Sequence, residues 1–218
     1  MDIPDHEITI RRGPAQSATH VRFVSAHRLN PLTRGMVTDL LSAVKELSDA
    51  GPSVITFQGG ENFSCGAHTG ELAAMSEAQL SAFIDDELEL CDLIAHLPAI
   101  TIAAIRGVCI GNAAELALSC DLRVACHDAA FAWPEVMIGY PAPVKRLASH
   151  VGRGPATQLA VLGEQATARR AYEIGLVSEV VEPASFERRL AELAERAAGL
   201  PRGAVAETKK RLDAAFSC

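Results

Sequence analysis

Basic residues are in the minority in this sequence of 218 residues, which has 20 Lys and Arg against 27 Asp and Glu and a formal net charge of −7. Nonspecific nucleic-acid binding needs a basic face, so this balance argues against it. No apolar run approaches the roughly 20 residues that span a bilayer, and no apolar segment follows the polar residues 1–14. We therefore expect no membrane span, no signal peptide and a cytoplasmic location.

Sequence patterns of several common site types are also missing. The six cysteines include no C-x-x-C pair and most lie in apolar runs, which predicts buried, reduced thiols. The seven histidines lack ligand spacing, so we expect no metal site. A phosphate-binding loop, a dinucleotide-binding G-x-G-x-x-G after a strand and the G-x-S-x-G turn of serine hydrolases are absent. These absences argue against nucleotide binding and against serine hydrolase chemistry.

Strand patterns alternate with helix patterns over the first two thirds of the chain, which predicts an α/β fold with a largely parallel sheet. The predicted strands cover residues 7–10, 20–25, 53–57, 99–105, 121–126 and 177–181, with a turn at Gly13-Pro14. The predicted helices cover residues 33–50, 76–96, 115–120, 144–151, 155–163, 168–174, 183–198 and 203–216. We divide the chain into a core domain, residues 1–182, and a C-terminal helical segment, residues 183–218. We expect the helix-rich last third of the chain to pack on the core or on another subunit.

Two loops rich in small residues follow predicted strands, at the edge where open α/β sheets bind ligands. The first ends in Gly66-Ala67, and the second contains Gly111-Asn112 and runs into a helix. Small residues let a ligand approach the backbone closely. Two N–H groups converging from such loops would form an oxyanion hole, which contributes roughly 3–4 kcal/mol per donor. Ordinary turn and helix-start chemistry is the alternative.

Two glutamates follow these loops in apolar surroundings. Glu115 lies just inside the helix after the second loop, and Glu135 lies in the apolar stretch 131–136. One buried strand separates them and could return the chain to the same end of the sheet. Two carboxyls in an apolar cleft split their pKa values into an acid and a base. The alternatives are a capping box from Asn112 to Glu115, and a helix first turn after Pro134 for Glu135.

Three segments in this order resemble the motifs of the crotonase (enoyl-CoA hydratase/isomerase) superfamily, and the resemblance extends over residues 29–216. They are residues 63–67 (FSCGA), 104–121 (AIRGVCIGNAAELALSCD) and 131–139 (FAWPEVMIG). The resemblance implies a crotonase-like spiral of ββα turns with C-terminal helices, assembled as a homotrimer or a dimer of trimers. It also implies a thioester of coenzyme A or acyl carrier protein as the substrate, with no separate cofactor.

By this resemblance, the N–H groups of Ala67 and Asn112 bind the thioester oxygen and stabilise an enolate. Glu115 deprotonates the water that adds at Cβ, and Glu135 supplies the proton at Cα. Members that only shift a double bond commonly keep just the later glutamate, so the pair favours hydration or dehydration of a 2-enoyl thioester. The alternatives are a double-bond isomerase or decarboxylase in biosynthesis, and a non-catalytic auxiliary subunit. The further residues expected at the substrate site are Arg28, Cys65, Gly66, His68, Gly111, Trp133 and Tyr140.

Several positions depart from the family pattern. Asn112 stands where the family often has glycine, and His68 replaces the usual Asp. Residues 139–147 are shorter than the family's stretch and carry two prolines, which favours an unusual acyl specificity. Typical members continue through further helices beyond the position of Cys218, and those helices help to cover the CoA site and build the trimer.

Basic residues that would bind the CoA phosphates are a separate expectation. Arg28 is the first candidate, and Lys145 with Arg146 is the second. A solvated surface charge is the alternative for each of them. For His68, the alternative to a role in the substrate pocket is an exposed loop histidine.

Overall fold

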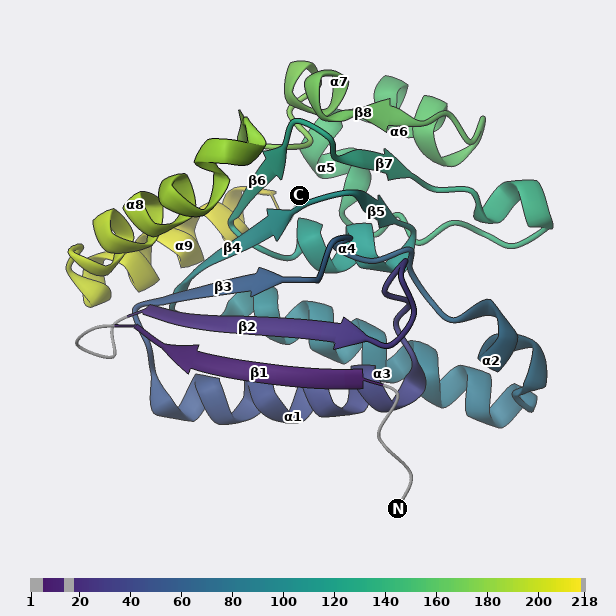
Figure 1. Cartoon of the computed structure of the whole chain (residues 1–218), viewed down its shortest axis with the longest axis horizontal. Helices are drawn as coiled ribbons and strands as arrows, with labels where there is room; N and C mark the ends of the chain where they lie inside the picture. The colour runs from purple at the N-terminus through teal and green to yellow at the C-terminus, as the bar shows by residue number, and fades with distance from the viewer. Residues whose placement is uncertain (1–5, 14–17, 217–218) are drawn as a thin grey trace.

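Six strands form the main sheet, in the order β1-β2-β3-β4-β6-β9 (Figure 1). The structure, a computed structural model, describes residues 6–13 and 18–216, so Pro14 of the predicted turn lies outside the described residues. Only β1 runs antiparallel to its neighbour, which confirms the predicted largely parallel sheet. The strands are β1 (His6–Arg12), β2 (Ala18–Ser25), β3 (Val54–Gln58), β4 (Ile100–Ile105), β6 (Leu122–Cys126) and β9 (Glu179–Val181).

Helices cover both faces of this sheet (Figure 1). Alternate residues of the strands face opposite layers. In β3, Ile55 and Phe57 join the cluster that contains the apolar faces of α1 (Arg34–Ala50) and α3 (Glu77–His96). Val54 joins the cluster formed with α8 (Phe186–Ala198) on the other face. The predicted packing of the C-terminal helices against the core is thus confirmed for α8.

The ends of the long helices follow from local side chains. The Thr33 hydroxyl accepts a hydrogen bond from the Met36 N–H at the start of α1, and Gly51 ends α1 in the left-handed region. Ser76 and Gln79 form a capping box at the start of α3. Both helices therefore begin and end close to where the sequence predicts.

A second, three-stranded sheet and several short helices complete the described fold. The remaining strands are β5 (Val108–Ile110), β7 (Ala130–Ala132) and β8 (Ala166–Thr167). The remaining helices are α2 (Thr69–Ala74), α4 (Asn112–Leu118), α5 (Leu147–Val151), α6 (Arg153–Ala160), α7 (Ala168–Glu173) and α9 (Arg202–Phe216), with 3-10 turns η2 (Glu135–Ile138) and η3 (Pro183–Ser185). Helix α2 was not predicted, because it buries no residue and so shows no apolar periodicity. None of the helices described here has both the length and the apolar character that a membrane crossing needs.

Candidate active site

The two small-residue loops lie in direct contact. The Ser64 N–H donates to the Val108 carbonyl at 3.0 Å, and the Ile110 N–H donates back to the Ser64 carbonyl at 3.1 Å. A Cβ added to Gly66, whose φ is 85°, would lie 2.7 Å from the Ile110 carbonyl oxygen and 3.6 Å from the Asn112 nitrogen. Glycine at position 66 therefore permits the approach of one loop to the other.

The N–H groups of Ala67 and Asn112 are both free at this junction. Around Ala67, the Leu32 N–H donates to the Gly66 carbonyl and the His68 N–H donates to the Leu32 carbonyl, so the N–H of Ala67 itself points away from Leu32. Asn112 is the first residue of α4, where N–H groups have no intrahelical acceptor. Neither N–H has a hydrogen-bond partner within the described part of the chain. Two free donors on touching loops are the groups that an oxyanion hole needs, and their convergence on one oxygen stays a prediction.

The Glu135 carboxylate lies against the second loop. A Cβ added to Gly111 would lie 2.0 Å from Glu135 Oε1. Gly111 has φ 56° and ψ −122°, a backbone region that essentially only glycine adopts. Glu135 is the first residue of the 3-10 turn η2 after Pro134. The alternative interpretation of Glu135 as a helix-start residue is therefore correct, and it is compatible with the contact to the loop. Burial raises the pKa of Glu135, and its Oε2 is buried without a partner in the described chain.

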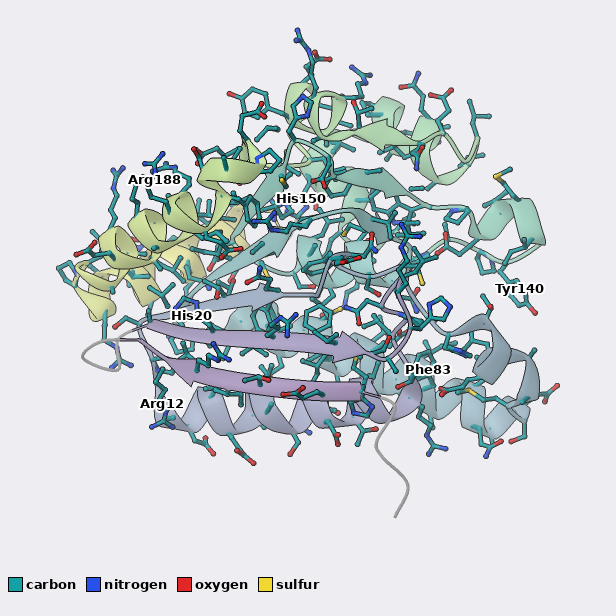
Figure 2. The ribbon with its side chains drawn as sticks, in the orientation of Figure 1. Arg12, His20, Phe83, Tyr140, His150 and Arg188 are labelled. Carbon is teal, nitrogen blue, oxygen red and sulfur yellow. The ribbon has the colours of Figure 1, made fainter. Side chains whose placement is uncertain are left out.

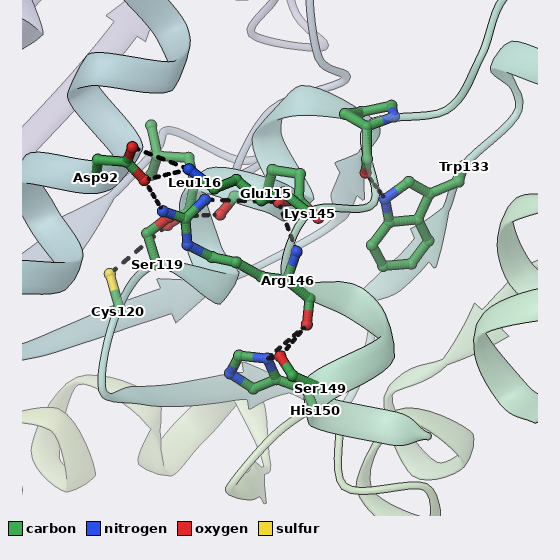
Figure 3. A network of polar contacts seen from close by, with 11 residues as sticks. Asp92, Glu115, Leu116, Ser119, Cys120, Trp133, Lys145, Arg146, Ser149 and His150 are labelled. Carbon is green, nitrogen blue, oxygen red and sulfur yellow. Dashed lines mark hydrogen bonds and ion pairs between the residues drawn. The ribbon is translucent and has the colours of Figure 1, made fainter. Parts of the chain in front are cut away.

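Glu115 lies one turn into α4 and is 6% exposed. Its Oε2 accepts the backbone N–H of Arg146 at 3.2 Å and lies 3.8 Å from Nη1 of the same residue (Figure 3). Burial raises its pKa to about 7, and the charge of Arg146 opposes that shift. The alternative interpretation of Glu115, a capping box with Asn112, is wrong, because α4 is capped by Gly111 without a side-chain hydrogen bond. Glu115 thus lies in the first turn of the helix that begins at the Gly111 loop, and Glu135 contacts that loop at Gly111.

Arg146 is held on both sides by carboxylates. Its guanidinium pairs with Asp92 of α3 as well as with Glu115, and Lys145 binds the same Asp92 at 2.8 Å (Figure 3). Burial raises the pKa of Asp92, but the hydrogen bonds from Lys145 and Arg146 outweigh it and lower that pKa. A solvated surface charge is the wrong description of Arg146, whose side chain is 13% exposed. The expected binding of CoA phosphates by Lys145 and Arg146 stays a prediction.

A third carboxylate, the half-buried Glu87, contacts the second loop although no motif indicated it. It lies on α3, and one of its oxygens accepts a short hydrogen bond from the Asn112 side-chain amide. Burial raises the pKa of Glu87 to about 7, while that hydrogen bond lowers it. Within the described residues, the buried side-chain polar atoms without a partner are one oxygen each of Glu87, Glu115 and Glu135. Glu87 contacts Asn112, Glu135 contacts Gly111 and Glu115 lies in the same helix turn, so all three carboxyls surround the start of α4.

The other predicted substrate residues take varied positions. His68 is a helix cap rather than an exposed loop histidine: its Nδ1 accepts the Glu71 N–H at 3.0 Å at the start of α2. Trp133 is fully buried and donates from Nε1 to the Pro143 carbonyl at 3.0 Å, which ties down the segment before Lys145 (Figure 3). Their roles in substrate binding stay predictions.

Three more predicted residues lie toward the outside of the site. Tyr140 is 62% exposed and projects from the edge of the molecule (Figure 2). Arg28 is exposed, and its carbonyl accepts a hydrogen bond from the Asn62 side chain. Cys65 is half-buried, and burial raises the pKa of its thiol. Within residues 6–13 and 18–216, no three His, Cys, Asp or Glu side chains gather as metal ligands.

The raised pKa values of Glu87 and Glu115 predict a pH-dependent stability. Each carboxyl binds its proton more tightly in the folded protein, so its contribution to the free energy of unfolding is full below about pH 4.5 and is lost as pH rises through about 7. Glu115→Gln removes the contribution of Glu115, so between about pH 4.5 and 7 the free energy of unfolding should fall less in the variant than in the wild type. Asp92 has a lowered pKa, so its contribution to the free energy of unfolding has the opposite pH dependence and is lost as the pH falls.

Urea unfolding of both proteins at several pH values measures this difference. The difference in unfolding free energy between Glu115→Gln and the wild type should grow in the variant's favour from about pH 4.5 to 7.5. A difference that stays constant, or that shrinks with rising pH, would contradict the raised pKa of Glu115.

Comparison with known proteins assigns the family. The family model described as Enoyl-CoA hydratase/isomerase matches residues 15–218. Enoyl-CoA hydratase domain-containing protein 2, mitochondrial, of Homo sapiens is 33% identical over 183 residues, which are 80% of this chain and 63% of that protein. Short-chain-enoyl-CoA hydratase of Clostridium acetobutylicum is 28% identical over 211 residues, 95% of this chain and 81% of that protein.

Solved structures agree with the sequence matches. The crystal structure of enoyl-CoA hydratase from Bacillus anthracis is similar with a TM-score of 0.90 at 27% identity, and the match covers 94% of this chain and 82% of that one. This likeness confirms the predicted crotonase fold. Because the family model covers nearly the whole chain, the protein belongs to the enoyl-CoA hydratase/isomerase family.

Proposed function

We propose that this protein is an enoyl-CoA hydratase that adds water reversibly to a 2-enoyl thioester. One observation carries the proposal: Glu135 lies against Gly111 beside the free N–H of Asn112, Glu115 lies in the first turn of the helix that this loop begins, and each carboxyl has an unpartnered buried oxygen. A reaction that needs a base for water, an acid for carbon and an oxyanion hole uses all of these groups. The family match supports an acyl-CoA substrate.

The two glutamates differ in their charged neighbours. Burial raises the pKa of both carboxyls, to about 7 for Glu115, and the charge of Arg146 opposes the shift of Glu115. Glu135 has no ion pair in the described chain. We assign Glu115 as the general base because the guanidinium beside it stabilises its carboxylate form, and the role of the general acid then falls to Glu135.

The chemical steps follow from these roles. Glu115 takes a proton from water while the water oxygen forms a bond to Cβ. The electron pair of the carbon–carbon double bond moves through Cα to the thioester oxygen, where the N–H groups of Ala67 and Asn112 stabilise the enolate. The enolate then takes a proton at Cα from Glu135, which leaves a 3-hydroxy thioester.

An apolar groove supports an apolar acyl group. The groove has a volume of about 360 Å³, its lining includes Val136, the residue after Glu135 in the sequence, and most of its lining residues, drawn from 136–148 and 153–161, are apolar. Burying apolar surface there would stabilise the bound chain by about 25 cal/mol per Å². The predicted homotrimer or dimer of trimers, and the cytoplasmic location, stay predictions.

Turnover of a panel of 2-enoyl-CoA thioesters, from short-chain to aromatic, tests the proposed function. Mass spectrometry of the products should show the gain of one water with at least one panel member. Product isomers without a mass change would favour the alternative, a double-bond isomerase, and loss of carbon dioxide from a carboxylated thioester would favour a decarboxylase. No turnover of any panel member, with CoA thioester binding retained, would favour an acyl-carrier-protein substrate or a non-catalytic auxiliary subunit.

A further inference from the structure

The side chain of Asn112 has an unusual partner for a residue at an oxyanion loop. Its amide Nδ2 donates to Glu87 on α3, and so the loop before α4 is tied to a helix 25 residues earlier in the chain. The contact is partly shielded from solvent, because Glu87 is half-buried and its second oxygen is inaccessible and unpartnered in the described chain. The hydrogen bond therefore fixes which way the Asn112 amide points.

An asparagine in this place creates a problem that glycine does not. Asn side chains readily bond to their own or neighbouring backbone N–H groups. The N–H of Asn112 is free, and it is the donor assigned to the thioester oxygen. An unrestrained Asn112 side-chain oxygen would compete with the substrate for this donor. Glu87 removes the competition by binding the amide end on the side of α3.

We propose that Glu87 is a positioning residue of the oxyanion hole, which holds the Asn112 side chain on α3 so that the backbone N–H of Asn112 stays open to the thioester oxygen. The inference rests on the proposed function, because it presumes a thioester oxygen at that N–H. Glu87 transfers no proton in this role and needs only an acceptor atom. Glutamine supplies such an acceptor, whereas methionine of similar length does not.

The test compares kcat/KM of Glu87→Met and Glu87→Gln, each made both in the wild-type protein and in the Asn112→Gly variant. Glu87→Met should lower kcat/KM by about tenfold to a hundredfold, as expected for a displaced oxyanion donor. Glu87→Gln should retain most of the activity. The effect of Glu87→Met should disappear in the Asn112→Gly background, since no side chain is left to hold.

A spectroscopic readout separates positioning from a general structural role. A saturated acyl-CoA labelled with ¹³C at the thioester carbonyl is not hydrated, and its resonance should shift downfield on binding to the wild type. Glu87→Met should reduce that shift, and Glu87→Gln should restore it. Glu89→Ala removes a 54% exposed carboxylate from the same helix and should change neither the shift nor turnover. Thermal unfolding shows which variants are folded, and Glu87→Ala replaces Glu87→Met if the latter does not fold.

The outcomes distinguish this inference from the proposed function. Wild type with neither a carbonyl shift nor turnover would overturn both. A wild-type shift that survives in Glu87→Met would overturn the inference alone. Equal losses in Glu87→Met and Glu87→Gln would assign Glu87 to proton transfer instead. A loss that persists unchanged in the Asn112→Gly background would also overturn positioning through Asn112.

Discussion

Glu135→Gln is expected to lower kcat by about 10²–10⁴-fold while acyl-CoA binding is retained. Glutamine is close in size to glutamate and keeps an oxygen near Gly111, but it has no acidic proton to deliver at Cα. The Glu135 carboxyl is partly buried with one oxygen unpartnered in the described chain, so no neighbour there is positioned to replace it. Binding depends on the loops and the groove, which the substitution leaves in place.

The measurement compares turnover and acyl-CoA affinity of the two proteins on the best substrate of the panel. Glu195→Gln, at an exposed position of α8 on the opposite face of the main sheet from α3, is the matched control and should behave as the wild type. The pH dependence of kcat/KM should change its shape in Glu135→Gln, because one of the two titrating carboxyls is absent. A variant with unchanged kcat would remove Glu135 from the mechanism and with it the hydratase proposal.

The fold could be predicted largely from local patterns. The β-branched and apolar runs of β3, β4 and β6 indicate buried parallel strands, and Thr33 and Ser76 indicate where two long helices begin. Helix α2 escaped prediction because its stability comes from a cap at His68 and not from a buried face. Local caps without apolar periodicity leave only a weak signal in the sequence.

The site was predictable where chemistry lies in a motif and unpredictable where it depends on tertiary contact. Glu87 carried one signal in the sequence: it lies one turn after Phe83 and one turn before Cys91, both of which are buried on α3. That spacing places a carboxylate on an apolar helix face. Its partner Asn112 lies on another helix, and no periodicity within either helix reports their contact. The ion pair of Arg146 with Glu115 could not be predicted either, because it also joins two separate segments of the chain.

Gly111→Ala is expected to lower kcat/KM by about 10²-fold and to destabilise the protein. The added Cβ would lie 2.0 Å from Glu135 Oε1, so the carboxyl must move away from the loop. A displacement of about 1 Å of a reacting group is enough for a 10²-fold loss. The backbone at φ 56° and ψ −122° adds a strain of about 1–3 kcal/mol for alanine.

Gly152→Ala separates the strain from the collision. Gly152 also has a backbone conformation reserved for glycine, with φ 75° and ψ 166°, but an added Cβ there meets no atom of the described chain within 4 Å. It should lose stability and keep its activity, whereas Gly111→Ala should lose both. In the Glu135→Gln background, Gly111→Ala should cost much less further activity, because the proton donor that it displaces is already absent. Full additivity of the two losses would show that the Gly111 backbone acts on the thioester without Glu135, and the oxyanion hole alone would then explain the requirement for glycine.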